Sequence, residues 1–171
     1  MAPQVTCFND ITPDRFNWKV VARVIRLWKV PSKIDQTIIN SIDMILVDGQ
    51  GGKIHASIKK TQVNNFYNIV KEGNTYVFQN ILVVPNDGKY RATRNAHKII
   101  FIKTTRVTNC KVENIPGITY DFTNFLDIIT DGDDTWLIDV IGHVIERDEV
   151  KDINKSGHSH KILEITLQDL S

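Results

Sequence analysis

The chain has 171 residues, of which 42% are hydrophobic, and a formal net charge of +1. This length and composition allow one full domain plus a smaller unit, and they exclude a chain that is disordered throughout. No apolar run approaches the roughly 18 residues of a membrane-spanning helix, so no membrane association is expected. The near-neutral total conceals a split: residues 1–111 hold 17 Lys and Arg against 7 Asp and Glu, whereas residues 112–171 hold 4 against 13. The basic part predicts a negatively charged partner, such as nucleic acid.

The two cysteines, Cys7 and Cys110, are too few for a disulfide framework or a four-cysteine zinc site. We therefore expect free thiols in a reducing compartment, the cytosol or the nucleus. No cofactor or metal is expected, and no spacing of residues indicates a catalytic triad.

The first expected strand covers residues 18–30, a long run rich in Val and Ile that is broken by Lys and Arg. Such a run is typical of a bent barrel strand that changes the face it buries. Residues 42–47 form the next expected strand, and the glycine-rich residues 48–52 form a tight turn.

Residues 53–58 alternate between apolar and polar side chains, which indicates a strand with one exposed face. Together with residues 42–47 they predict a hairpin. Its exposed face is expected to be polar and basic, and it carries Lys53, His55 and Ser57.

Residues 60–72 have the apolar spacing of a helix, with Val63, Phe66, Tyr67 and Val70 on one stripe. Two further strands are expected at 74–84 and 90–103, separated by a turn at 85–88. The resulting order, three strands, a helix and two strands, is the layout of an OB-fold. We therefore predict an all-β fold with one helix, built as a five-stranded Greek-key barrel.

The rest of the chain resembles the start of a second barrel. Residues 118–129 read as a short helix or a turn, and strands are expected at 136–145 and 161–167. We predict an OB domain at 1–107, a linker at 108–120 and an acidic, partial second OB unit at 121–171.

Three segments resemble the large (70 kDa-type) subunit of replication protein A: WKVVARV at 18–24, the hairpin from LVD at 46–48 to IHA at 54–56, and the helix at 62–67. The resemblance is to the tandem OB domains that bind single-stranded DNA, in the divergent form abundant in plants. It implies a non-catalytic, nuclear protein that acts in DNA replication, repair or recombination. It also implies other subunits of replication protein A as partners, and no small-molecule substrate.

The resemblance further implies a groove across the second and third strands with two stacking aromatic residues. Tyr90 matches the second position, whereas Lys59 stands where the first aromatic is expected, which removes one stacking platform. His55 replaces a basic groove residue.

The residues expected to bind nucleic acid are basic or aromatic and lie on the first strand, the third strand and two loops: Arg23, Arg26, Trp28, Lys33, Lys53, His55, Lys59, Tyr90, Arg91 and Arg94. Binding should show little sequence preference. The alternative reading of the same residues is a solvated sheet face with an ordinary hairpin, and Trp28 could instead cap the end of the barrel. The choice between DNA and RNA stays open. The alternative function is a protein-interaction OB domain that binds acidic partner segments.

Overall fold

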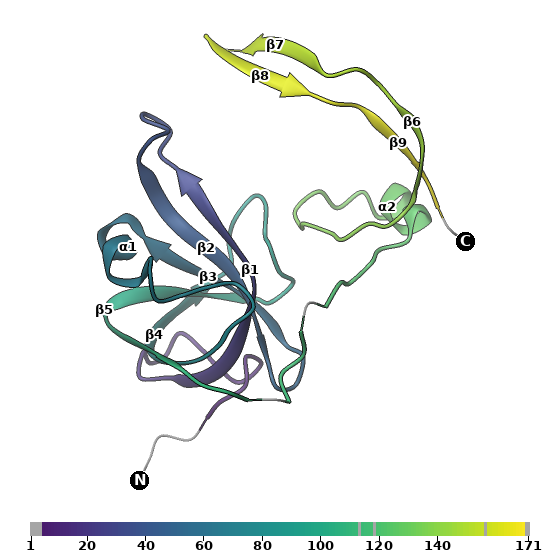
Figure 1. Cartoon of the computed structure of the whole chain (residues 1–171). Helices are drawn as coiled ribbons and strands as arrows, with labels where there is room; N and C mark the ends of the chain where they lie inside the picture. Colours follow the sequence, from purple (N-terminus) through teal and green to yellow (C-terminus); the bar gives the residue numbers. More distant parts are fainter. Residues whose placement is uncertain (1–4, 113, 118, 156, 170–171) are drawn as a thin grey trace. The chain divides into compact units, whose positions relative to one another are not determined.

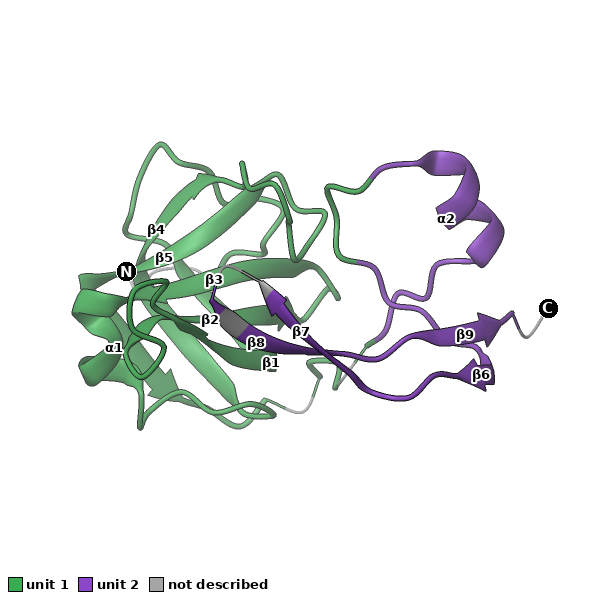
Figure 2. Cartoon of the chain, turned by 90° about the horizontal axis from the view of Figure 1, so that it is seen from above, with its two compact units in different colours: residues 1–119, 134–137 green, residues 120–133, 138–171 purple. Residues whose placement is uncertain are grey.

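The computed structural model describes residues 5–112, 114–117, 119–155 and 157–169. The chain divides into two compact units (Figure 2): residues 1–119 with 134–137 form unit 1, and residues 120–133 with 138–171 form unit 2. The outer limits of the two predicted domains, at residues 1 and 171, lie outside the described residues.

Unit 1 is a closed five-stranded barrel with one helix between its third and fourth strands (Figure 1). Neighbouring strands are antiparallel, except that the third and fifth strands run parallel where the barrel closes. The predicted OB-fold is therefore confirmed. The elements are β1 (Lys19–Pro31), β2 (Ile39–Asp48), β3 (Lys53–Lys59), α1 (Lys60–Phe66), β4 (Thr75–Pro85) and β5 (His97–Asn109), and the strands close in the order β1-β2-β3-β5-β4.

The core follows from the alternation of apolar side chains along the strands. Val20, Ala22 and Val24 of β1 are fully buried. The register of β1 against β2 shifts between Val24 and Arg26, so that Ile25 is also buried, in a second small cluster with Val47. The predicted change of buried face along β1 is therefore produced by a β-bulge.

The turn between β2 and β3 is organised by Asp48, which is only 3% exposed. Its carboxylate accepts hydrogen bonds from the backbone N–H groups of Gln50 (3.0 Å) and Gly52 (2.9 Å). It also accepts one from Phe8 N–H at 2.8 Å, which fixes the segment before β1 to the barrel. One buried carboxylate thus closes the turn and anchors the amino-terminal segment.

The last barrel strand starts later than predicted. Residues 90–96 were expected to belong to it, but β5 begins at His97 and residues 86–96 form a loop. The buried side chain of Asn86 donates hydrogen bonds to the carbonyl oxygens of Thr93 (3.1 Å) and Asn95 (2.9 Å). These bonds satisfy two backbone acceptors inside the loop without a strand ladder.

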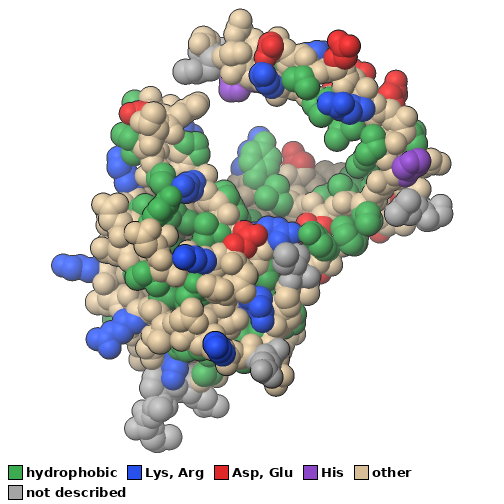
Figure 3. Space-filling view, in the orientation of Figure 1, with side chains coloured by type: hydrophobic (Ala, Val, Ile, Leu, Met, Phe, Trp, Pro, Cys, Tyr) green, Lys and Arg blue, Asp and Glu red, His purple; other side chains and the backbone are tan. Residues whose placement is uncertain are grey.

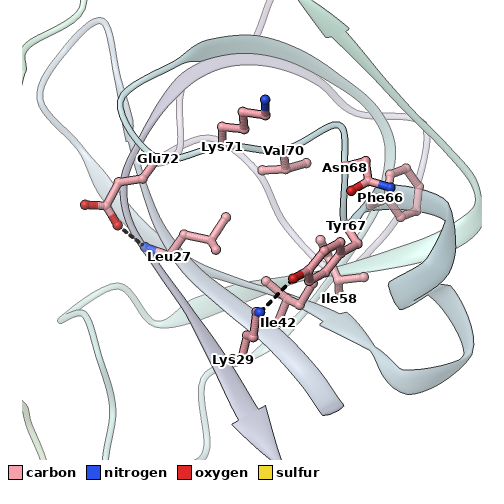
Figure 4. A pocket seen from close by; sticks show the side chains of 10 residues that line it. All are labelled: Leu27, Lys29, Ile42, Ile58, Phe66, Tyr67, Asn68, Val70, Lys71 and Glu72. Carbon is pink, nitrogen blue, oxygen red and sulfur yellow. Dashed lines mark hydrogen bonds between the residues drawn. The ribbon is translucent and has the colours of Figure 1, made fainter. Parts of the chain in front are cut away.

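The edge of β1 beyond Arg23 is not paired with β4, because the β1–β4 pairing covers only Lys19 to Arg23. There the segment that follows α1 covers the edge of β1. Glu72 accepts a hydrogen bond from Leu27 N–H at 2.7 Å, and Lys29 Nζ donates one to Tyr67 Oη at 2.7 Å (Figure 4). A cavity of about 470 Å³ with a mainly apolar lining lies under this segment.

Unit 2 contains a helix, α2 (Phe125–Asp131), and two two-stranded sheets. The side chain of Asn124 caps the first turn of α2 by accepting from Leu126 N–H, and Gly132 ends the helix in the left-handed region. The helix overlaps the segment 118–129, for which a helix or a turn was expected, and ends two residues beyond it. Among the described residues, no helix is long and apolar enough to cross a membrane.

The strands of unit 2 form two antiparallel pairs in which nearly every residue is exposed. The prediction of a strand at 136–145 was wrong for its first part, because residues 136–142 make only isolated bridges. The strand expected at 161–167 is interrupted at residues 163–164. The pairs are β6 (His143–Arg147) with β9 (Ile165–Gln168), and β7 (Lys151–Lys155) with β8 (His158–Ile162).

Candidate nucleic-acid interface

A continuous outer surface, here called the groove face, runs across the first three strands of the barrel. Residues that lie opposite one another in paired antiparallel strands share one side of the sheet. In one row Trp28 pairs with Asp43, which pairs with Ser57, and in the next row Arg26, Ile45 and His55 are aligned in the same way. The groove face consists of Arg26, Trp28, Asp43, Ile45, His55 and Ser57.

The centre of the groove face is a hydrogen-bonded cluster around Asp43. Its Oδ1 accepts from Ser57 Oγ at 2.7 Å, and its Oδ2 lies 3.3 Å from His55 Nε2. The His55 ring stacks on Trp28, with ring centroids 5.9 Å apart and planes inclined by 14°. Burial alone would raise the pKa of Asp43, but the hydrogen bonds from His55 and Ser57 outweigh it and lower the pKa below its usual value.

The cluster around Asp43 makes the groove face less basic and less exposed than the sequence predicted. Ser57 is only 2% exposed, although the alternation of β3 placed it on an exposed face. The reason is Asp43 on the neighbouring strand, which covers the Ser57 hydroxyl and accepts its hydrogen bond. The face is therefore not uniformly basic: its middle holds a carboxylate whose side chain is 17% exposed.

Two loops flank the groove face at opposite ends of β3. Lys98, near the start of β5, pairs with His55, so the loop at 86–96 emerges beside the first half of β3. The loop at 32–38 leaves the sheet beyond the pairs of Ser41 with Lys59 and with Val30, at the other end. A strand of nucleic acid lying along β3 would thus meet both loops.

The exposed side chains of these loops include an aromatic ring and several cations. Tyr90 is 65% exposed, and Lys89 Nζ lies 5.2 Å from the centre of its ring. Lys33 and Arg94 are exposed in the two loops, and Lys59 is exposed at the end of β3. Figure 3 shows Lys and Arg side chains spread over much of the visible face of the barrel.

Three of the predicted cations on the sheet have protein partners. Arg23 donates to the carbonyl oxygens of Gly73 and Ile115, both at 3.2 Å, and Lys53 Nζ donates to Thr119 O at 2.9 Å. Arg26 donates to the carbonyl of Ile25 at 2.7 Å. These contacts stabilise the outer side of the barrel and restrict how far the three side chains can extend toward a ligand.

Arg91 holds the 86–96 loop to residues 134–137, a contact that sequence reasoning missed. Its guanidinium lies 3.7 Å from the centre of the Trp136 ring and donates to Thr135 Oγ1 at 3.0 Å. The backbones also pair, since Arg91 N–H donates to Thr135 O and Leu137 N–H donates to Arg91 O. The sequence shows that Trp136 is an aromatic residue, but nothing in it indicates that this ring meets Arg91.

The part of the chain that the structure describes holds no group of three or more His, Cys, Asp or Glu side chains placed to bind a metal ion. Cys7 and Cys110 are free.

Comparison with known proteins gives a family and several distant relatives. The family model described as "Domain of unknown function DUF223" matches residues 9–131. The replication protein A 70 kDa DNA-binding subunit of Xenopus laevis is 22% identical over 93% of this chain, and that of Drosophila melanogaster is 24% identical over 95%. A 70 kDa DNA-binding relative from Oryza sativa is 27% identical over 95%. The chain spans 25–28% of the length of these relatives, and their names refer to binding rather than to catalysis.

Since the relatives include frog and fly proteins, a specifically plant form is not confirmed. Among solved structures, a replication protein A heterotrimer bound to single-stranded DNA aligns with 97% of this chain and 39% of its own chain. The TM-score is 0.61 and the sequence identity is 20%, a likeness of fold.

Proposed function

The chain belongs to the DUF223 domain family, and from this premise we propose that unit 1 binds single-stranded DNA as a non-catalytic module of the replication protein A type. The distant relatives carry the name of DNA-binding subunits, which supports the proposal. The observation that carries it is the groove face, flanked at both ends by loops that bear Tyr90 and exposed cations.

Each part of this surface suits one part of a single strand. A base can stack on the exposed ring of Tyr90, a contact worth about 1–3 kcal/mol per base and tolerant of sequence. Phosphates can meet Lys33, Lys59 and Arg94, which are exposed. The groove face is about 20 Å long over the seven residues of β3, which suits the few nucleotides that one OB-fold holds.

The proposal is tested by fluorescence anisotropy of the full chain with labelled (dT)12 at two salt concentrations. If the three exposed cations contact phosphates, the logarithm of the affinity should fall by about 2 for each tenfold rise in salt, at about 0.7 per contact. The same measurement with (rU)12 decides between DNA and RNA. The absence of binding at micromolar protein and low salt would refute the proposal.

We also propose the wider setting that the relatives suggest. As a replication protein A type module, the chain would act in the nucleus, in DNA replication, repair or recombination, and would meet other subunits of such a complex. Co-purification of tagged chain with those subunits from its own cells tests this part.

The alternative function, binding of acidic protein segments, is favoured by one observation: exposed Lys59 stands where a stacking aromatic was expected. The Asp43 carboxylate within the groove face does not decide between the two functions, because it repels the carboxylates of an acidic peptide and the phosphates of a nucleic acid alike. Competition between an acidic peptide and (dT)12 separates the two functions, since a protein-recognition module would bind the peptide more tightly.

A further inference from the structure

The Asp43 carboxylate is an unusual group for a surface that binds a phosphate chain. It lies in the middle of the groove face, between Trp28 on β1 and Ser57 on β3. Its lowered pKa keeps it ionised at neutral pH. A fixed negative charge at this place weakens the attraction of every phosphate nearby, so it costs affinity unless the ligand offers hydrogen-bond donors.

The hydrogen bonds of Asp43 leave part of its acceptor capacity unused. A carboxylate has about four lone-pair sites on its two oxygens. Ser57 Oγ occupies one site on Oδ1 at 2.7 Å, His55 Nε2 faces Oδ2 at 3.3 Å, and the Ser41 side chain adds a further, weaker hydrogen bond. The side chain is 17% exposed, so part of it is open to a ligand on the groove face, and the contacts with Ser57 and His55 beside it fix its orientation.

From this geometry we infer that Asp43 recognises a base edge rich in N–H donors, above all that of guanine, in a single strand bound on the groove face. The inference rests on the proposed binding of single-stranded DNA and adds a base preference at one position to it. Guanine presents N1–H and N2–H2 side by side and can meet both carboxylate oxygens. Cytosine and adenine present one amino group beside an acceptor nitrogen, and thymine presents a single N–H between two carbonyl oxygens.

The aromatic neighbours suit this role. Trp28 lies directly opposite Asp43 in the β1–β2 register and is held parallel to the His55 ring. A purine whose donor edge meets Asp43 would therefore enter beside flat aromatic side chains. A good bidentate contact of this kind discriminates between bases by roughly 5- to 150-fold.

The experiment uses the full chain and (dT)12 in which one thymine at a time is replaced by guanine. At one position the wild type should bind the guanine oligonucleotide about 5- to 150-fold more tightly than (dT)12. At that position hypoxanthine, which lacks the amino group, and 2-aminopurine, which lacks N1–H, should each lose most of the gain. This series needs no protein variant.

Asp43→Asn assigns the preference to the carboxylate. It keeps the shape of the side chain, and it should flatten the base series while binding to (dT)12 stays equal or becomes tighter. Asp35→Asn removes the same charge from the exposed 32–38 loop and should keep the preference, as a matched control.

A flat wild-type series, or a preference that survives in Asp43→Asn, would overturn the inference while leaving the proposed function intact. Failure to bind every oligonucleotide, (dT)12 included, would overturn both.

Discussion

Replacement of Tyr90 by alanine should separate binding from folding. The side chain is 65% exposed, and its loop is held by Asn86 and Arg91 rather than by the ring. The free energy of unfolding should therefore change by less than about 0.5 kcal/mol. Affinity for (dT)12 should fall by about 1–3 kcal/mol, the worth of one stacked base, which is roughly 5- to 150-fold.

Two comparison variants sharpen this test. Tyr90→Phe keeps the ring and should bind within about twofold of the wild type, because stacking needs no hydroxyl group. Lys103→Ala removes one exposed cation from β5 and should lose less affinity than Tyr90→Ala. The measurements are anisotropy at low salt and urea denaturation. Equal losses in Tyr90→Ala and Lys103→Ala, or an equal loss in Tyr90→Phe, would refute stacking on this ring.

Three further variants test the contacts that shape the barrel and its groove face. Asp48→Ala leaves three backbone N–H groups without their carboxylate acceptor. It should lower the free energy of unfolding, measured in urea, by about 3 kcal/mol or more. A loss under about 1 kcal/mol would contradict the anchoring role of Asp48. Because the pKa of Asp43 is lowered in the folded state, its ionised form stabilises the fold; this stabilisation is complete above about pH 4 and is lost as the pH falls through the folded pKa. The difference in unfolding free energy between the wild type and Asp43→Asn should therefore shrink from pH 6 to pH 3. A difference that stays constant over this range would argue against the lowered pKa. Arg91→Ala should cost about 0.5–2 kcal/mol through loss of the contact with Trp136 and change the tryptophan fluorescence, whereas an unchanged spectrum and stability would show that the contact is absent in solution.

The barrel was predictable because its signals are local. Alternating apolar residues define β3, and the helical spacing of Val63 and Phe66 defines α1, so the strand and helix order follows from short windows of sequence. The helix itself is shorter than the predicted range 60–72, because it ends at Phe66. The late start of β5 was not predictable in this way, since it depends on the hydrogen bonds from the Asn86 side chain to Thr93 and Asn95 and on the backbone pairing of Arg91 with residues 135 and 137.

The sequence predicted the β2–β3 hairpin that carries most of the groove face, but it did not predict the acidic group at the centre of that face. Asp43 carried no signal in its own strand, because its role depends on Ser57 and His55, 14 and 12 residues away on β3. The same holds for Arg23, whose carbonyl partner at Ile115 is 92 residues distant. Alternation says which side of a sheet a residue occupies, but not which distant group meets it there.

The central claim, that the groove face and its two flanking loops bind single-stranded DNA, is tested most directly by NMR. A titration of the ¹⁵N-labelled full chain with (dT)12 should shift the backbone amide signals of β2, β3 and the loops at 32–38 and 86–96, together with the indole signal of Trp28. The claim would be contradicted if the β2 and β3 signals stayed unmoved and the shifts were confined to residues that line the cavity under the segment after α1, or to the strands of unit 2.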